Sequence, residues 1–252
     1  MVFANESNSF DDKRKPQHRS PSHPPNPCNG ISHPDTVACV RLSWAQLIPM
    51  LDALEITQLH DQATHRWHGT EPWPDPSAFP PTSLLGTVLA NHRANFDLWH
   101  TEDKAREPGA TDSSIAAVKR AIDILNQTRN DLVEKIDHIL FEAAGKQNAD
   151  SPLHSESPGL ILDRLSILAL KVFHTAEETR RTTATEGHRQ KNLARLALLE
   201  EQRSDLAHCL DALWNQVLAG KRRFKIYRQM KMYNDPDLNP AIYAHNPPGK
   251  SS

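Results

Sequence analysis

The sequence contains no uninterrupted apolar run of the roughly 18 residues that a transmembrane helix requires. Its most apolar window, residues 159–173, is interrupted by charged residues, namely Asp163, Arg164 and Lys171. The N-terminal residues also lack the apolar core of a signal peptide. We therefore expect no membrane-spanning segment and no interaction with a membrane.

Cysteine is scarce as well. The three cysteines, Cys28, Cys39 and Cys209, lack the spacing of a metal site, and any disulfide between two of them leaves one unpaired. Because disulfides are rare in reducing compartments, we expect a reduced, cytoplasmic protein. The sequence also lacks a glycine-rich phosphate loop, a Ser-His-Asp pattern and an HExxH motif, so it identifies no cofactor.

Neither sign of charge is in excess, and glycine and aromatic residues are few. The formal net charge of the 252 residues is −2, whereas domains that bind nucleic acid usually carry a strong basic excess. This balance argues against a nucleic-acid partner. Nine glycines and 6% aromatic residues, together with long runs rich in Leu, Ala, Glu and Arg, favour helices over a β-sandwich.

The residues that are present predict an all-α fold, an antiparallel bundle of about five long helices with a disordered N-terminal tail. The tail, residues 1–38, is rich in Pro, Ser and His and cannot bury enough apolar surface to offset the entropy lost on ordering. The helical domain covers residues 39–245. The expected helices span residues 43–67, 82–107, 112–145, 157–180 and 185–219. The third is expected to be the central element.

Residues 91–137 combine apolar and polar faces at helical spacing. In the third expected helix, Arg129 occupies one position of an apolar series that recurs every three or four residues. A buried guanidinium keeps its charge and needs a carboxylate or an anionic ligand. The apolar series consists of Ile115, Val118, Ile122, Leu125, Leu132, Ile136 and Ile139. The adjacent polar stripe consists of Lys119, Asp123, Asn126, Asn130, Glu134 and Asp137.

The second expected helix has a face that changes from apolar to polar along its length, where Trp99, Asp103 and Arg106 follow one another at helical spacing. Its connection to the third helix is short, so the two helices should be antiparallel neighbours. This geometry places the polar end of the second helix opposite Lys119 and Asp123.

Four segments, in this order, resemble a known protein family. They are LWHTEDKAR at residues 98–106, IDILNQTRND at 122–131, SESPGLILDRLSILALK at 155–171 and KIYRQMKMYNDPDLNP at 225–240. Over about residues 40–243 the chain resembles the bacterial domain of unknown function (DUF) family 4254. The resemblance implies an all-helical bacterial domain, and it carries over no activity, cofactor or catalytic residue.

Cationic, amide and aromatic side chains on these faces predict a polar pocket between the second, third and fourth helices. Such a pocket suits an anionic small molecule, a carboxylate or a phosphate. The expected ligand-binding residues are Asn95, Trp99, Arg106, Lys119, Asn126, Arg129 and Asn130. The candidates for acid or base catalysis are Asp103, Asp123 and His174.

Two other functions agree with the sequence. Glu102, Asp103, Glu134 and Asp137 offer oxygen ligands for a divalent cation. Glu134-x-x-Asp137 is similar to half of the paired acidic motif of all-α nucleotide pyrophosphohydrolases, a class of metal-dependent hydrolase, but the matching Glu-x-x-Glu is absent. Alternatively, the long helices and the basic segment 221–231 bind a protein partner, as in a helical interaction or scaffold protein.

The same charged residues also fit a purely structural role. Arg129 is expected to pair with Asp103 or Asp123, and Arg106 with Glu102 or Asp123. Interhelical ion pairs of this kind fix the register of neighbouring helices without binding a ligand.

His65 and His68 lie three residues apart at the end of the first expected helix. Two imidazoles at this spacing can share a metal ion, but the sequence shows no third ligand. We interpret these two histidines as part of a frayed helix end.

Overall fold

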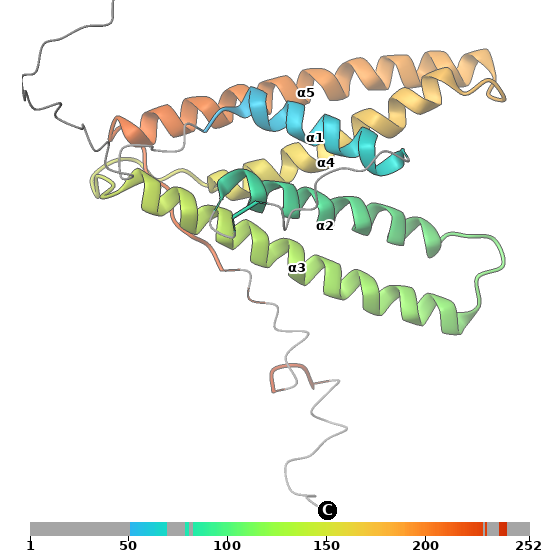
Figure 1. Cartoon of the computed structure of the whole chain (residues 1–252), viewed down its shortest axis with the longest axis horizontal. Helices are drawn as coiled ribbons and strands as arrows, with labels where there is room; N and C mark the ends of the chain where they lie inside the picture. The colour runs from blue at the N-terminus through green and yellow to red at the C-terminus, as the bar shows by residue number, and fades with distance from the viewer. Residues whose placement is uncertain (1–50, 70–78, 81–82, 229, 231–236, 241–252) are drawn as a thin grey trace, which may run out of the picture. The chain divides into compact units, whose positions relative to one another are not determined.

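The computed structural model describes residues 51–69, 79–80, 83–228, 230 and 237–240 (Figure 1). Within them the chain forms five helices, which confirms the expected all-α bundle. The helices are α1 (Ala53–His68), α2 (Leu84–Lys104), α3 (Asp112–Ala144), α4 (Pro158–Arg180) and α5 (Glu186–Leu218). None of these helices is both long and apolar enough to cross a membrane. The predicted tail, residues 1–38, lies outside the described residues.

Two helical hairpins and one further helix make up the bundle. Short connections join α2 to α3 and α4 to α5, so that each pair is antiparallel, and α1 packs against α2, α4 and α5 (Figure 1). The helix that contacts all four others is α4. The expectation that the third helix is central was wrong, because the first part of α3 is largely exposed whereas α4 is apolar on several sides.

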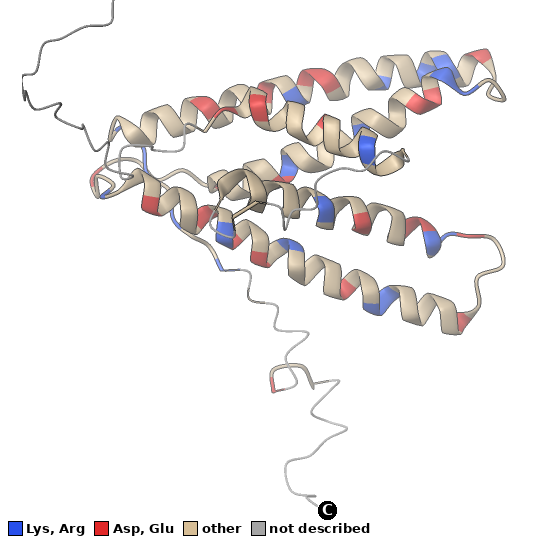
Figure 2. Ribbon diagram, in the orientation of Figure 1, with Lys and Arg blue, Asp and Glu red and all other residues tan. Residues whose placement is uncertain are grey.

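Charged residues of both signs are distributed along α3 and α5 (Figure 2). Four helices begin with a hydroxyl cap, whose side-chain oxygen accepts a backbone N–H from the first turn. These caps are Ser83, Thr111, Ser157 and Thr185.

The predicted first helix is interrupted before Ala53, where α1 begins. Asp52 is extended, with φ −116° and ψ 107°, and its carboxylate accepts the N–H groups of Leu54 and Glu55. The prediction of a continuous helix over residues 43–67 was therefore wrong, because Leu51 and Asp52 are not helical and α1 begins at Ala53. Residues 43–50 lie outside the described residues.

The apolar core lies where α1, α2 and α4 begin and α3 and α5 end (Figure 1). Its fully buried members include Ile56, Ile136, Leu140, Leu162, Leu165 and Leu210. After α5 the chain returns to this core, where Phe224 is buried and Arg223 exchanges backbone hydrogen bonds with Pro152 and His154. The segment after α5 thus packs onto the bundle through Phe224, whereas Met230 is 79% exposed.

A buried carboxylate joins α3 to the start of α4. Asp137 Oδ2 accepts a hydrogen bond from the Ser157 hydroxyl at 2.5 Å, and its Oδ1 accepts the Gly159 N–H at 2.6 Å. Negative charge at a helix N-terminus is favourable. Burial nevertheless raises the pKa of Asp137 to about 6, against the opposing effect of these two hydrogen bonds.

We expect Gly159→Ala to destabilise the bundle and Gly187→Ala to leave it as stable or more so. Both glycines are the second residue of a helix. A Cβ at Gly159 would lie 2.7 Å from the Val133 carbonyl oxygen, whereas nothing lies within 4 Å of one at Gly187. Overpacking of this kind costs about 1–3 kcal/mol, and Ala is favoured over Gly in a helix by up to about 1 kcal/mol. Urea unfolding of both variants measures the difference, and equal effects would contradict this contact.

The raised pKa of Asp137 makes stability depend on pH. A carboxyl group whose pKa is higher in the folded state binds its proton more tightly there, so its stabilisation is full below pH about 4 and is lost as the pH rises through about 6. The free energy of unfolding of the wild type should therefore fall relative to Asp137→Asn over this range, by about 3 kcal/mol. Denaturant titrations at a series of pH values measure it. A difference that does not change with pH would refute the raised pKa.

Candidate functional site

A network of buried polar side chains runs through α1, α2 and α4. We call it the polar seam, and its members are Thr64, Asn91, His92, Asn95, Asp163 and Ser166. None of these residues is more than 5% exposed. Buried polar groups are tolerated when they are hydrogen-bonded to one another, and their donors and acceptors then fix one arrangement.

The donor and the acceptor of each hydrogen bond around His92 can be assigned. The Thr64 hydroxyl donates its single proton to the His60 carbonyl oxygen at 2.8 Å. His92 Nε2, 2.9 Å from the Thr64 oxygen, must therefore donate to it. Burial lowers the pKa of His92 to about 3, so the ring is neutral and its Nδ1 accepts from the Ser166 hydroxyl at 2.8 Å.

The other end of the polar seam surrounds the Asp163 carboxylate. The Asn95 side-chain amide donates to Ser166 Oγ at 3.0 Å and to Asp163 Oδ1 at 2.9 Å. Asn91 donates to the same carboxylate oxygen at 3.1 Å. From α3, Arg129 Nε lies 3.3 Å from that oxygen. The polar seam thus ends in an ion pair that connects α4 to α2 and α3.

A cavity of about 430 Å³ adjoins this ion pair, between α2, α3 and α4. It is lined by Asn95, Leu98, Trp99, Glu102, Asp103, Arg106, Arg129, Ile167 and Leu170. Apolar side chains therefore form part of its wall, and four ionisable groups lie around it. Arg106 pairs with Glu102 at 3.1 Å and is mostly exposed, whereas only 26% of the Arg129 side chain is exposed.

Six of the residues singled out in the sequence line this cavity, and the other predicted ligand-binding residues do not. The six are Asn95, Trp99, Glu102, Asp103, Arg106 and Arg129. Lys119 instead pairs with Asp123 along the exposed side of α3, and Asn126 donates to the carbonyl of its own helix at Ile122. Asn130 is not among the lining residues.

The acidic residues proposed as metal ligands divide in the same way. Glu102 and Asp103 line the cavity, but Asp137 binds the start of α4. Glu134 lies near Asp137 on α3. The hydrolase and scaffold functions stay predictions from the sequence.

The expected partners of Arg129 were wrong. Its ion pair is with Asp163, not with Asp103 or Asp123. The reason is that α4 packs against both α2 and α3, so that Asp163 of α4 reaches Arg129. Periodicity within one helix does not show which other helix packs against it. Arg106 pairs with Glu102 one turn earlier, within its own segment.

A second group of polar side chains lies beside Trp99, where three histidines from α1, α2 and α4 converge. They are His68, His100 and His174, and the Trp99 indole stacks on His174 with ring centroids 5.0 Å apart. Burial lowers the pKa of His100, as do His68 and His174, and Asp103 and Asp97 oppose this effect. His68 and His174 were each noted in the sequence, but their convergence with His100 was not predicted, because the three lie far apart along the chain.

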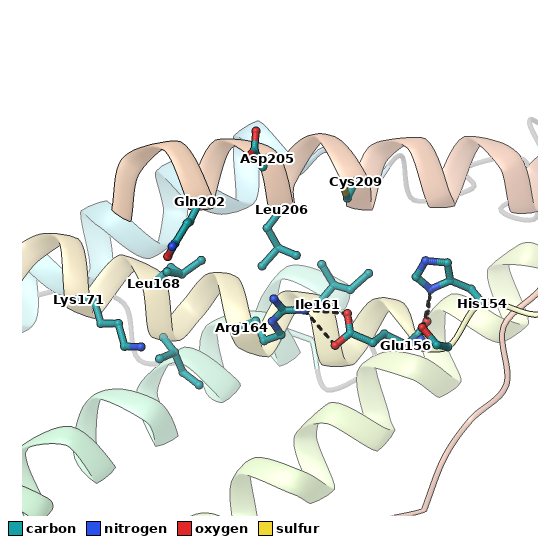
Figure 3. A pocket seen from close by; sticks show the side chains of 12 residues that line it. His154, Glu156, Ile161, Arg164, Leu168, Lys171, Gln202, Asp205, Leu206 and Cys209 are labelled. Atoms are coloured by element: carbon teal, nitrogen blue, oxygen red, sulfur yellow. Dashed lines mark hydrogen bonds and ion pairs between the residues drawn. The ribbon is translucent and has the colours of Figure 1, made fainter. Parts of the chain in front are cut away.

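A larger hollow of about 820 Å³ lies between α4 and α5 (Figure 3). Its one arginine, Arg164, is held by both carboxylate oxygens of Glu156 at 3.0 and 2.8 Å. Lys171 and Asp205 lie on opposite sides of it (Figure 3). The Arg164 side chain is 54% exposed and that of Arg129 only 26%, so this hollow is a weaker candidate for an anion than the cavity beside Arg129.

These features define an all-α protein in which a buried polar network adjoins a cavity between three helices. The chain belongs to the family described as "Protein of unknown function (DUF4254)", whose model matches residues 86–226, more than half of its length. This confirms the resemblance seen in the sequence, over a shorter extent than residues 40–243. The match covers nearly all of α2 and the whole of α3, α4 and α5, and α1 lies outside it. No curated protein and no solved structure matches the chain.

We expect Asp163→Ala to destabilise the protein far more than Asp123→Ala. Each carboxylate pairs with a cation of α3, but Asp163 is buried and its loss leaves Arg129 unpaired. Removing one partner of a buried pair costs about 3–5 kcal/mol, whereas an exposed pair such as Lys119–Asp123 contributes about 0–1 kcal/mol. Urea unfolding measures both variants. Similar losses would show that Asp163 is not the essential carboxylate.

Proposed function

We propose that the protein binds a small anionic molecule, a carboxylate or a phosphate, in the cavity between α2, α3 and α4. The proposal concerns binding and names no reaction. We further propose that it acts in the bacterial cytoplasm, which suits the free thiol of Cys209 and the resemblance of the sequence to a bacterial family.

The main support for the proposal is the position of Arg129 and its incomplete hydrogen bonding. Its guanidinium lies in the cavity wall, and its Nε is buried without a well-aligned hydrogen bond. Within the part of the chain that the structure describes, its one ion pair is the contact of Nε with Asp163. A guanidinium has five N–H donors, so its terminal amino groups are available to hold a carboxylate or phosphate in a bidentate manner.

The rest of the cavity defines the kind of anion that fits. Leu98, Ile167 and Leu170 line it together with the Trp99 indole, so the ligand should have an apolar or aromatic body beside its charged group. Arg106 is mostly exposed and pairs with Glu102 within one helical turn. Because such exposed pairs contribute little to stability, Arg106 can exchange Glu102 for the ligand at little cost.

A thermal-shift screen of the full chain against carboxylates, sugar phosphates and nucleotides tests the proposal. A ligand at about 100 times its dissociation constant adds roughly 2.7 kcal/mol of stability, which corresponds to a rise in Tm of about 5–10 °C. Arg129→Lys should weaken the shift strongly, because an ammonium group keeps the charge but cannot form the bidentate contact.

The matched control is Lys119→Ala. This variant removes a cation from the same helix, but Lys119 is exposed, pairs with Asp123 and does not line the cavity. It should keep the full shift in Tm. The proposal fails if no anion shifts Tm, or if the shift is unchanged in Arg129→Lys.

A further inference from the structure

Three histidines from separate helices present nitrogen atoms to one another. His68 is the last residue of α1, His100 lies in α2 and His174 in α4. One ring nitrogen from each lies within 4.8 Å of the other two. The Nε2 atoms of His68 and His100 are only 3.1 Å apart. Three imidazoles at such distances can share one ion.

In His68 and His174 the other ring nitrogen is already hydrogen-bonded, which orients these two rings. His68 Nδ1 lies 2.8 Å from the Thr64 carbonyl oxygen, an acceptor, so this nitrogen carries the proton. His174 Nδ1 likewise donates to the Glu177 carboxylate at 2.9 Å. When neutral, each of these two rings has its lone pair on Nε2. A histidine that binds a metal usually donates its other N–H to a carboxylate or a backbone carbonyl in this way.

One of the free nitrogens is buried. His174 Nε2 has no hydrogen-bond partner among the described residues, although it is shielded from solvent. A buried polar atom without a partner costs about 1–3 kcal/mol, so the arrangement is unfavourable unless something binds there. His68 is exposed, which leaves the cluster open to solvent on one side.

The spacing agrees with a small transition-metal ion. Tetrahedral zinc has Zn–N distances of about 2.0–2.1 Å, which separates two ligand nitrogens by about 3.3 Å. The separation between His68 and His100 is 3.1 Å. Without a metal, His100 must donate a proton across this gap to the lone pair of His68. With a metal, His100 carries its proton on Nδ1 and both Nε2 lone pairs bind the ion.

Aromatic rings hold each imidazole in place. Phe173 stacks on His68 with ring centroids 4.3 Å apart, and Trp99 stacks on His174 at 5.0 Å. The edge of Phe96 packs on His100, with ring centroids 4.5 Å apart. An apolar shell of this kind limits ring rotation and lowers the local dielectric, both of which strengthen metal binding.

We infer that His68, His100 and His174 form a binding site for one divalent transition-metal ion of the zinc class, with a fourth coordination position open. Imidazole ligands suit Zn²⁺, Cu²⁺, Ni²⁺ and Co²⁺, whereas Mg²⁺ and Ca²⁺ require oxygen ligands. Three histidines with an open fourth position is also a ligand set of catalytic zinc sites. The inference does not depend on anion binding beside Arg129.

Zinc titration of the full chain, freed of metal by a chelator, tests the site. Competition with a chromophoric chelator should show tight binding of one Zn²⁺ per chain, which His100→Asn and His174→Asn abolish. His65→Ala is the matched control. It lies one turn before His68 in α1 and also packs edge-on against Phe173, but it is outside the cluster. It should keep full affinity.

Two further readouts separate a metal site from simple packing. Co²⁺ should give the visible absorption of a tetrahedral ion, which is lost in His100→Asn. Glu177→Ala, which removes the carboxylate partner of His174, should weaken zinc binding by roughly 10–100-fold. Circular dichroism confirms that each variant is folded.

Two outcomes would overturn the inference. One is the absence of stoichiometric zinc binding by the wild type. The other is binding that survives His100→Asn and His174→Asn in folded protein, which would assign it to other histidines, such as His18, His23 or His33 of the N-terminal segment.

Discussion

One buried carboxylate, that of Asp163 in α4, determines how α2, α3 and α4 meet. It is 5% exposed, and a single oxygen accepts the amides of Asn91 and Asn95 beside the guanidinium of Arg129. An ionised carboxylate at this depth costs several kcal/mol unless such partners surround it. The three helices can therefore pack together only in the register that brings all of these groups to Asp163.

The same register positions both candidate sites. Asn95 and Arg129, which hold Asp163, are also part of the cavity wall. At the other end of the polar seam, Thr64 uses its hydroxyl to accept from His92, and its carbonyl oxygen accepts from the Nδ1 of His68. The polar seam thus connects the wall of the cavity to the histidine cluster through hydrogen bonds whose directions are fixed. Few other side chains could replace its members without leaving a buried donor or acceptor unpaired.

Local signals predicted α2 to α5 well, because three-four periodicity depends on residues close together in the sequence. They also identified Arg129, which stands in an otherwise apolar series. They could not identify its partner, since Asp163 looked like an interruption in the apolar window 159–173 and its role depends on where α4 crosses α2 and α3. Periodicity likewise placed Lys119 on a polar stripe without showing that this side of α3 is exposed, where Lys119 pairs with Asp123 of the same helix.

The histidine cluster shows a different limit of the sequence. A pair such as His65 and His68 is visible because it lies within one helical turn, yet the structure joins His68 to histidines of two other helices. A bundle selected only for stability would fill these positions with apolar side chains, because facing imidazoles gain little from packing and a buried Nε2 without a partner is unfavourable. The same reasoning applies to Arg129, which lines a cavity and whose buried Nε has no well-aligned hydrogen bond. In both places the polar groups exceed what the fold itself requires, and this excess is the physical basis of the two proposed sites.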